Sequence, residues 1–160
     1  EYTLNSLGYA ESFTRPRTST YYHEYSDEGY LIKSTYDEKE YTYSYEHGNL
    51  IRIDKGSSNV VFTPSNQIDN LNGPAFYQPL YLHIPGNIEV KVGYLAGLYG
   101  KQSYNLTAST VTTIGIGKTW EYNITVDYTY EKEQGYVTLQ TEKSRGASRV
   151  FESTLTFTYD

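Results

Sequence analysis

The chain has 160 residues and a formal net charge of −6, from 13 basic and 19 acidic side chains. Affinity for nucleic acid comes mainly from basic side chains that neutralise phosphates, so this balance predicts no nucleic-acid partner. The sequence contains no cysteine, which excludes disulfides and thiolate metal sites, and its 20 tyrosines supply most of the aromatic surface available for a core.

One hairpin pattern recurs along the first part of the chain. It consists of alternating aromatic residues, a short polar turn that ends in glycine, and a second strand-like run. Glycine adopts positive φ without penalty and closes loops of three to five residues, whereas Tyr, Thr, Val and Ile favour the flanking strands. The copies lie at residues 2–10, 25–32, 43–51 and 128–137, and residues 157–160 resemble the start of a fifth. Consecutive hairpins with short links predict an antiparallel meander.

Alternation within the runs predicts a sheet with one apolar and one polar face. Tyr41, Tyr43 and Tyr45 alternate with Thr42 and Ser44, and the segment 122–130 places Tyr, Ile and Val on one face and Asn, Thr and Asp on the other. Such alternation mainly indicates burial, so we expect most of these tyrosines to belong to the core. Surplus rings inside an incompletely filled curved sheet would line a groove for a ligand.

The middle of the chain interrupts the pattern. Four prolines disfavour regular ladders there, so we expect a Pro-rich excursion over residues 63–105 that packs against the sheet. Ile88 to Val92 alternates like a strand, and a short helix is predicted within Gly93 to Gly100. The organisation expected is therefore one β domain over residues 1–160, with hairpin repeats over 1–62 and returning strands over 106–160. The predicted fold is all-β, with roughly ten antiparallel strands in a curved sheet or partly open barrel.

The tyrosine-rich hairpins, the Pro-rich insertion and the segment Gly93 to Lys101 occur in an order that resembles a family of cell-envelope lipoproteins from Gram-negative gut bacteria. That family is known as a domain of unknown function with a porin-like fold, and the resemblance covers nearly the whole chain. It implies export, a periplasmic or cell-surface location, and a lipid anchor carried by a segment upstream of Glu1. It implies no catalytic chemistry. The sequence has no run of about 18 apolar residues, so no membrane-spanning helix is predicted.

Residues that could carry chemistry each have a simpler structural interpretation. Gly117-Lys118-Thr119 matches the end of a phosphate-binding loop, but the following residues read as a strand rather than the helix that such a loop requires. His23, His47 and His83 lack the spacing and number of ligands of a zinc site. The acidic groups read as solvated turns: Asp27 and Glu28; Asp37, Glu38 and Glu40; Glu131 and Glu133. A Ser–His–Asp arrangement is spatial, and the sequence leaves it open.

These observations predict a protein with no catalytic residues, metal or cofactor, and they leave the ligand-binding residues unknown. Our first hypothesis is a non-enzymatic envelope module that binds a carbohydrate or a small amphipathic molecule in a tyrosine-lined groove. The alternative is a structural module that docks a protein partner through a sheet edge or through its hairpin tips. A hydrolase is the third hypothesis, and it would need two carboxylates converging in a cleft. We expect any site to lie where the repeat fails, beside the excursion and Gly93 to Lys101.

Overall fold

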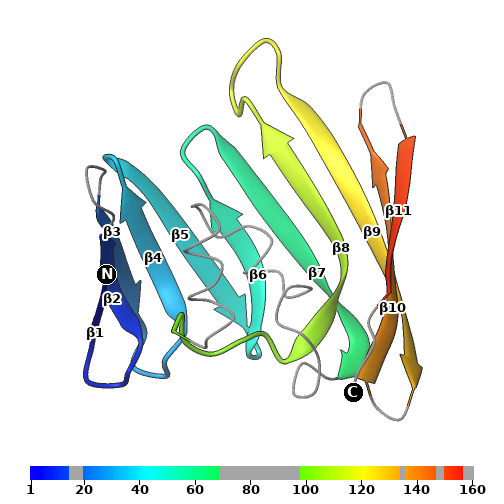
Figure 1. The fold of residues 1–160 in the computed structure, drawn as a ribbon. Helices are drawn as coiled ribbons and strands as arrows, with labels where there is room; N and C mark the ends of the chain where they lie inside the picture. Colours follow the sequence, from blue (N-terminus) through cyan, green and yellow to red (C-terminus); the bar gives the residue numbers. More distant parts are fainter. Residues whose placement is uncertain (15–19, 69–97, 134–135, 147–149, 157–160) are drawn as a thin grey trace.

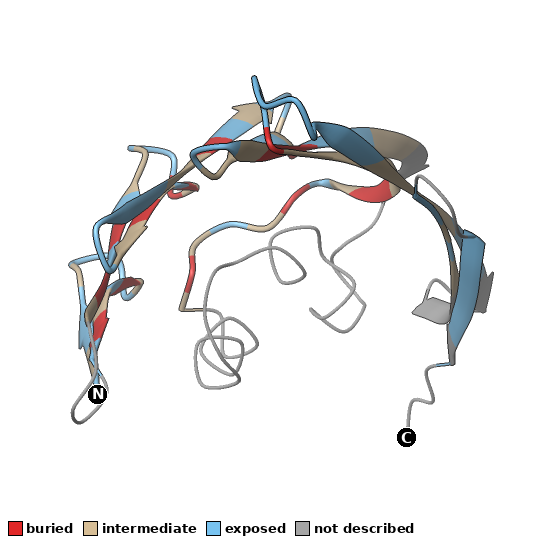
Figure 2. Ribbon diagram, turned by 90° about the horizontal axis from the view of Figure 1, so that it is seen from above, coloured by how far each residue is buried: buried red, intermediate tan, exposed pale blue. Residues whose placement is uncertain are grey.

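The computed structural model describes residues 1–14, 20–68, 98–133, 136–146 and 150–156. These residues form one antiparallel sheet whose eleven strands follow one another in chain order (Figure 1). The strands are β1 (Tyr2–Leu4), β2 (Ala10–Thr14), β3 (Thr20–Tyr25), β4 (Leu31–Tyr36), β5 (Lys39–Glu46), β6 (Asn49–Asp54), β7 (Ser58–Ile68), β8 (Asn105–Ile114), β9 (Tyr122–Glu133), β10 (Tyr136–Arg145) and β11 (Val150–Thr156). The predicted meander is therefore confirmed. The sheet bends into an arch without closing into a barrel (Figure 2).

The first three hairpins share one register. In each, the second strand contains a bulge three residues after the turn glycine, at Glu11, Ile32 and Ile51. A bulge leaves one residue unpaired and increases the local twist. The sequence repeat is therefore also a repeat of backbone geometry, and the three regularly placed bulges contribute to the curvature of the arch.

The turn glycines have the conformation that the repeat predicts. Gly29 has a φ of +88° and Gly48 a φ of +76°. Each also supports the tyrosine of the preceding hairpin, because a Cβ at Gly29 would lie 3.3 Å from the Tyr9 hydroxyl oxygen, and one at Gly48 would lie 3.2 Å from that of Tyr30. A side chain at either glycine would therefore disturb the packing between neighbouring hairpins.

The link between β4 and β5 departs from this rule. It is a two-residue turn in which Asp37 and Glu38 have φ values of 50° and 62° without any glycine. Positive φ at consecutive residues matches the right-handed twist of a hairpin, although non-glycine residues adopt it only with strain. Hairpin turns in this chain therefore do not all carry the glycine signature.

A crossing segment, residues Leu98–Tyr104, runs along the concave side of the arch before β8 begins (Figure 2). It contacts the turn ends of three hairpins in succession. The Leu98 carbonyl accepts a hydrogen bond from the Ala10 N–H at 2.7 Å. Two N–H groups donate to turn carbonyls: Lys101 to Gly29 at 2.8 Å, and Tyr104 to Gly48 at 3.0 Å.

The helix expected within Gly93 to Gly100 is wrong where it can be checked. Leu98 and Tyr99 form a turn, and Gly100 follows with a φ of +77°, outside the helical region. The backbone groups of the crossing segment bond to the hairpins rather than to one another. Residues 93–97 lie outside the described residues, as do the strand expected at Ile88 to Val92, the expected packing of most of the excursion, and the fifth hairpin opening at residues 157–160.

The excursion also begins later than expected, because β7 continues to Ile68. Pro64 lies within this strand at a shift in the register between β7 and β8. Proline is tolerated at such irregularities because it has no N–H to donate to a regular ladder. Returning strands begin at Asn105, close to the predicted start at Leu106.

The core lies on the concave face of β2–β7 and includes the crossing segment through Tyr99. Its buried residues are Ala10, Phe13, Tyr21, Leu31, Tyr43, Leu50, Ile53, Val60, Phe62 and Tyr99. Tyrosines at positions 2, 25, 36, 41 and 45 pack against it while remaining partly exposed. The prediction that alternating tyrosines form the core is confirmed for these strands. In the described part of the chain, no helix is long and apolar enough to cross a membrane.

Candidate functional site

The tyrosine cavity, as we name it, lies beside the turn between β3 and β4. It has a volume of about 420 Å³ and is lined by Ser26, Asp27, Glu28, Tyr30, Ile32, Tyr43 and Tyr45. Ile32 occupies the bulge of its hairpin, and Tyr45 pairs with Leu50, the residue directly before the bulge at Ile51 in the next one. The repeat therefore places an aromatic pair at this end of the sheet.

The rings of Tyr30 and Tyr45 lie 4.7 Å apart, centroid to centroid, at an interplanar angle of 36°. The Lys101 ammonium lies 5.6 Å from the centre of the Tyr30 ring, within range of a cation–π attraction. Asp27 and Glu28 occupy the exposed turn beside the pair. The cavity thus combines aromatic faces with carboxylates that can accept hydrogen bonds from hydroxyl groups.

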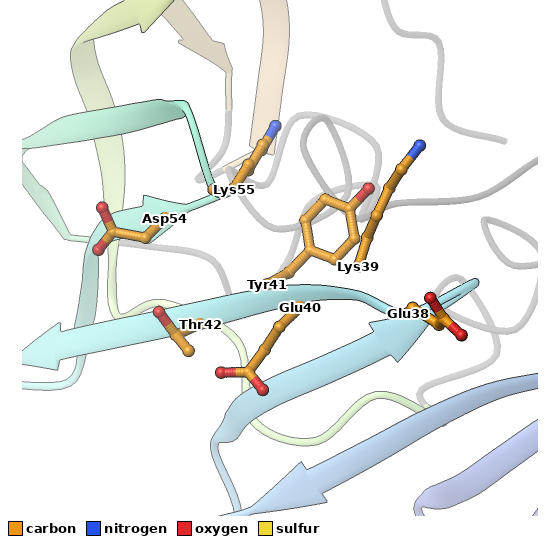
Figure 3. Close-up of a pocket in the computed structure, with 8 residues that line it drawn as sticks. Glu38, Lys39, Glu40, Tyr41, Thr42, Asp54 and Lys55 are labelled. Atoms are coloured by element: carbon orange, nitrogen blue, oxygen red, sulfur yellow. The ribbon is translucent and has the colours of Figure 1, made fainter. Parts of the chain in front are cut away.

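The sheet-end notch, as we name a second cavity, lies at the opposite end of β5. Strand β5 begins at Lys39, whereas its pairing with β6 ends at Thr42 and Asp54. The start of β5 therefore has no β6 neighbour, and a cavity of about 510 Å³ occupies this place. Figure 3 shows Lys39, Tyr41 and Lys55 extending to one side of the sheet and Glu40 and Thr42 to the other.

A serine–histidine pair does form, inside the core. His23 Nδ1 lies 2.9 Å from Ser34 Oγ, and the Tyr43 hydroxyl donates to the same oxygen at 3.2 Å. Ser34 is 0% and His23 4% exposed. Burial lowers the pKa of His23 to about 4. The third member of this hydrogen-bonded chain is a tyrosine rather than a carboxylate, and Ser34 and His23 are both buried in the core.

The Gly117-Lys118-Thr119 match belongs to the turn between β8 and β9. Its backbone closes on itself, since the Lys118 N–H donates to the Gly115 carbonyl at 2.8 Å. The Gly117 N–H donates to Glu121 Oε2, also at 2.8 Å. A strand follows at Tyr122, as predicted, so the helix required by a phosphate-binding loop is absent here.

The other candidate residues, the remaining histidines and the acidic groups, do not come together in one site. His47 is exposed in the β5–β6 turn, 3.8 Å from Glu46, and His83 lies outside the described residues. Asp27 and Glu28 border the tyrosine cavity, whereas Glu38 and Glu40 border the notch, at the other end of β5. Glu131 is exposed in β9, and the side chain of Glu133 lies outside the description. Where the structure describes side chains, no group of three histidine or acidic residues could hold a metal ion.

Sequence reasoning located neither cavity. Lys101 of the crossing segment approaches the Tyr30 ring of the tyrosine cavity, and the expectation of a site near Gly93 to Lys101 stays a prediction. The notch arises because β5 pairs with β4 as far as Lys39 but with β6 only as far as Thr42. The one sequence feature related to it is the short interval between Asp54 and Ser58. Neither the protein-family models nor the curated proteins include a match to this sequence.

Proposed function

We propose that this protein is a non-enzymatic binding module of the cell envelope, and that the tyrosine cavity receives a carbohydrate or a small amphipathic molecule. The observation that carries the proposal is the Tyr30–Tyr45 ring pair beside the carboxylates of Asp27 and Glu28. An aromatic face packs against the apolar face of a sugar ring, while carboxylates accept bonds from its hydroxyls. The volume of about 420 Å³ lies within the range of small-molecule sites.

The non-enzymatic part of the proposal is supported by the position of the Ser34–His23 pair inside the core. A general base has to reach the proton that it abstracts, and His23 is shielded from any ligand in the cavity. The envelope location is supported by the resemblance of the hairpin order to the lipoprotein family.

The test is a thermal-shift screen with neutral mono- and disaccharides and with short-chain alkyl glucosides, followed by calorimetric titration. We expect at least one of these ligands to raise the melting temperature. Tyr30→Leu should weaken its binding by about fivefold, because aromatic packing contributes about 1 kcal/mol beyond buried area. The matched control is Tyr22→Leu, an exposed tyrosine of β3 that lies outside the cavity. Equal binding by both variants, or no binding by any ligand, would contradict the proposal.

A second candidate function, self-association through a sheet edge, is favoured by β11. One side of β11 pairs with β10 in a register that contains no shift. Val150 and Phe151 of β11 are 62% and 60% exposed. An exposed apolar edge strand is a template for another strand. Antiparallel pairing of β11 with a second copy about Ser153 would place Phe151 opposite Leu155 without opposing like charges. A second copy of this chain is therefore the partner that we propose for this edge.

A further inference from the structure

The sheet-end notch contains both acidic and basic residues, and two of its carboxylates, Glu40 and Asp54, have basic partners. The Lys33 ammonium lies 2.7 Å from Glu40. Arg52 donates two hydrogen bonds to Asp54, at 2.7 and 2.8 Å, and this contact lowers the pKa of the Asp54 carboxyl. The carboxylates of Glu40 and Asp54 are therefore compensated by Lys33 of β4 and Arg52 of β6, whereas Glu38 lines the notch from the exposed β4–β5 turn.

The lysines of the notch differ from these carboxylates. No ion pair or hydrogen bond to another described residue is found for the ammonium of Lys39 or of Lys55. Lys55 is also partly buried, and this burial lowers its pKa because water no longer fully solvates the charge. A partly desolvated ammonium without a counter-charge is stabilised by a bound anion.

Tyr41 lies on the same side of the sheet as the two lysines (Figure 3). Its ring is partly buried against the core, so its position is set by packing. The notch thus presents two ammonium groups and an aromatic ring to a cavity of about 510 Å³, in a protein whose net charge is −6.

We propose that the sheet-end notch binds a small organic acid, with its carboxylate between Lys39 and Lys55 and its ring against Tyr41. The carboxylate would accept charge-assisted hydrogen bonds from the ammonium groups. A sugar acid and an aromatic acid share this chemistry. The site lies at the other end of β5 from the tyrosine cavity and does not depend on the function proposed for that cavity.

The test measures calorimetric titrations of the full chain with sodium glucuronate, sodium benzoate, glucose and inorganic phosphate at low salt. We expect glucuronate or benzoate to bind and glucose not to bind at the notch. Lys55→Gln should weaken that binding about tenfold, the effect of one lost charge-assisted bond. It should also raise the melting temperature of the unliganded protein, because an uncompensated partly buried charge is removed. The control is Lys118→Gln, an equal charge change in the exposed β8–β9 turn.

Each outcome decides the proposal. Binding of glucuronate alone identifies a sugar acid, and binding of benzoate identifies an aromatic acid. Binding of phosphate without either carboxylate overturns the assignment, as does equal loss in the Lys55 and Lys118 variants. Absence of binding by all four compounds also overturns it. Asp27→Asn separates the two sites, because it changes the tyrosine cavity and should leave glucuronate binding at the notch unaltered.

Discussion

At the scale of single residues, the core contains a chain of hydrogen-bonded polar groups. The Tyr43 hydroxyl donates to Ser34 Oγ, and His23 Nδ1 contacts the same oxygen. No hydrogen bond to another described residue is found for His23 Nε2. The His23 ring packs at 87° against Tyr99, with centroids 4.8 Å apart. A neutral imidazole is compatible with these contacts, whereas a charged one would have to be desolvated without a carboxylate partner.

The His23 pKa gives a prediction for stability against pH. The folded pKa of about 4 lies below the ordinary value of 6.5, so the neutral form is preferred in the folded state. The contribution of neutral His23 to the free energy of unfolding is complete above pH 6.5. It is lost as pH falls toward 4, because the unfolded chain takes up the proton first. We expect this group to reduce the free energy of unfolding by about 2 kcal/mol between pH 7 and pH 5.

Urea denaturation at pH 7, 6 and 5 measures this effect. His23→Gln should flatten the dependence, while His47→Gln, at an exposed turn position, should retain it. Carboxylates also change the free energy of unfolding with pH. Their contribution is the same in both variants, so it cancels when the two are compared. A slope in the His23 variant equal to that of the unmodified chain would show that another group is responsible.

At the scale of elements, the crossing segment contacts successive hairpins at intervals of three residues. Its contacts fall at residues 98, 101 and 104, opposite residues 10, 29 and 48 of successive hairpins. The first contact is made to the Ala10 N–H, and the next two are made to the carbonyls of the turn glycines Gly29 and Gly48, so the segment meets a backbone group of each hairpin. It also pairs Ser103 Oγ with the Leu50 N–H at 3.0 Å, beside the third bulge.

Gly100 is the place where this contact is closest. A Cβ there would lie 2.5 Å from the Gly29 carbonyl oxygen, and φ is +77°. Gly117 has a similar φ of +72° but nothing within 4 Å of a Cβ. Gly117→Ala should cost about 1 kcal/mol from the left-handed conformation alone. Gly100→Ala should cost at least about 2 kcal/mol more, because the backbone contact must also open.

The measurement is the free energy of unfolding of both variants under the same conditions. Equal losses would indicate that the crossing segment moves away from the β3–β4 turn without penalty. Loss of the Lys101–Gly29 hydrogen bond can be followed separately through amide exchange at Lys101, which should accelerate only in the Gly100 variant.

At the scale of the whole molecule, the arch ends in two edges of different character. The outer strand β1 has three residues and a register shift in its pairing with β2. Short and bulged edges resist pairing with other strands. The other edge, β11, has seven residues and a register with β10 that contains no shift. The two outer strands of the described sheet therefore differ in length and regularity, and β11 is the one that we propose for pairing with a second copy.

Self-association through β11 should appear in sedimentation velocity as a species of twice the monomer mass that increases with concentration. Phe151→Lys should remove it, because a charge on an edge strand is costly to bring into a paired sheet. Tyr22→Lys, an exposed aromatic position on β3, should leave it unchanged. A single monomeric species at all concentrations, or dimers in both variants, would contradict pairing through this edge.

Much of the fold follows from local chemistry that is readable in the sequence. Gly29 and Gly48 mark turns because positive φ favours glycine, and Tyr41, Tyr43 and Tyr45 share a face because side chains alternate along a strand. The turn at Asp37 and Glu38 carries no such signal. The expected helix ending at Gly100 was wrong because apolar spacing in a short segment does not distinguish a helix from a crossing chain whose bonds are made elsewhere.

The repeat alone determined that the chain forms an antiparallel meander, because its turns and alternation act between neighbouring residues. Tertiary structure decided how the hairpins are connected at one end, which edge is protected, and where the cavities lie. Those features depend on contacts between residues far apart in sequence, such as Lys101 with Gly29, and on unequal strand lengths, as at Thr42 and Asp54. Local propensity carries no information about either, so the candidate sites became visible only once the sheet was assembled.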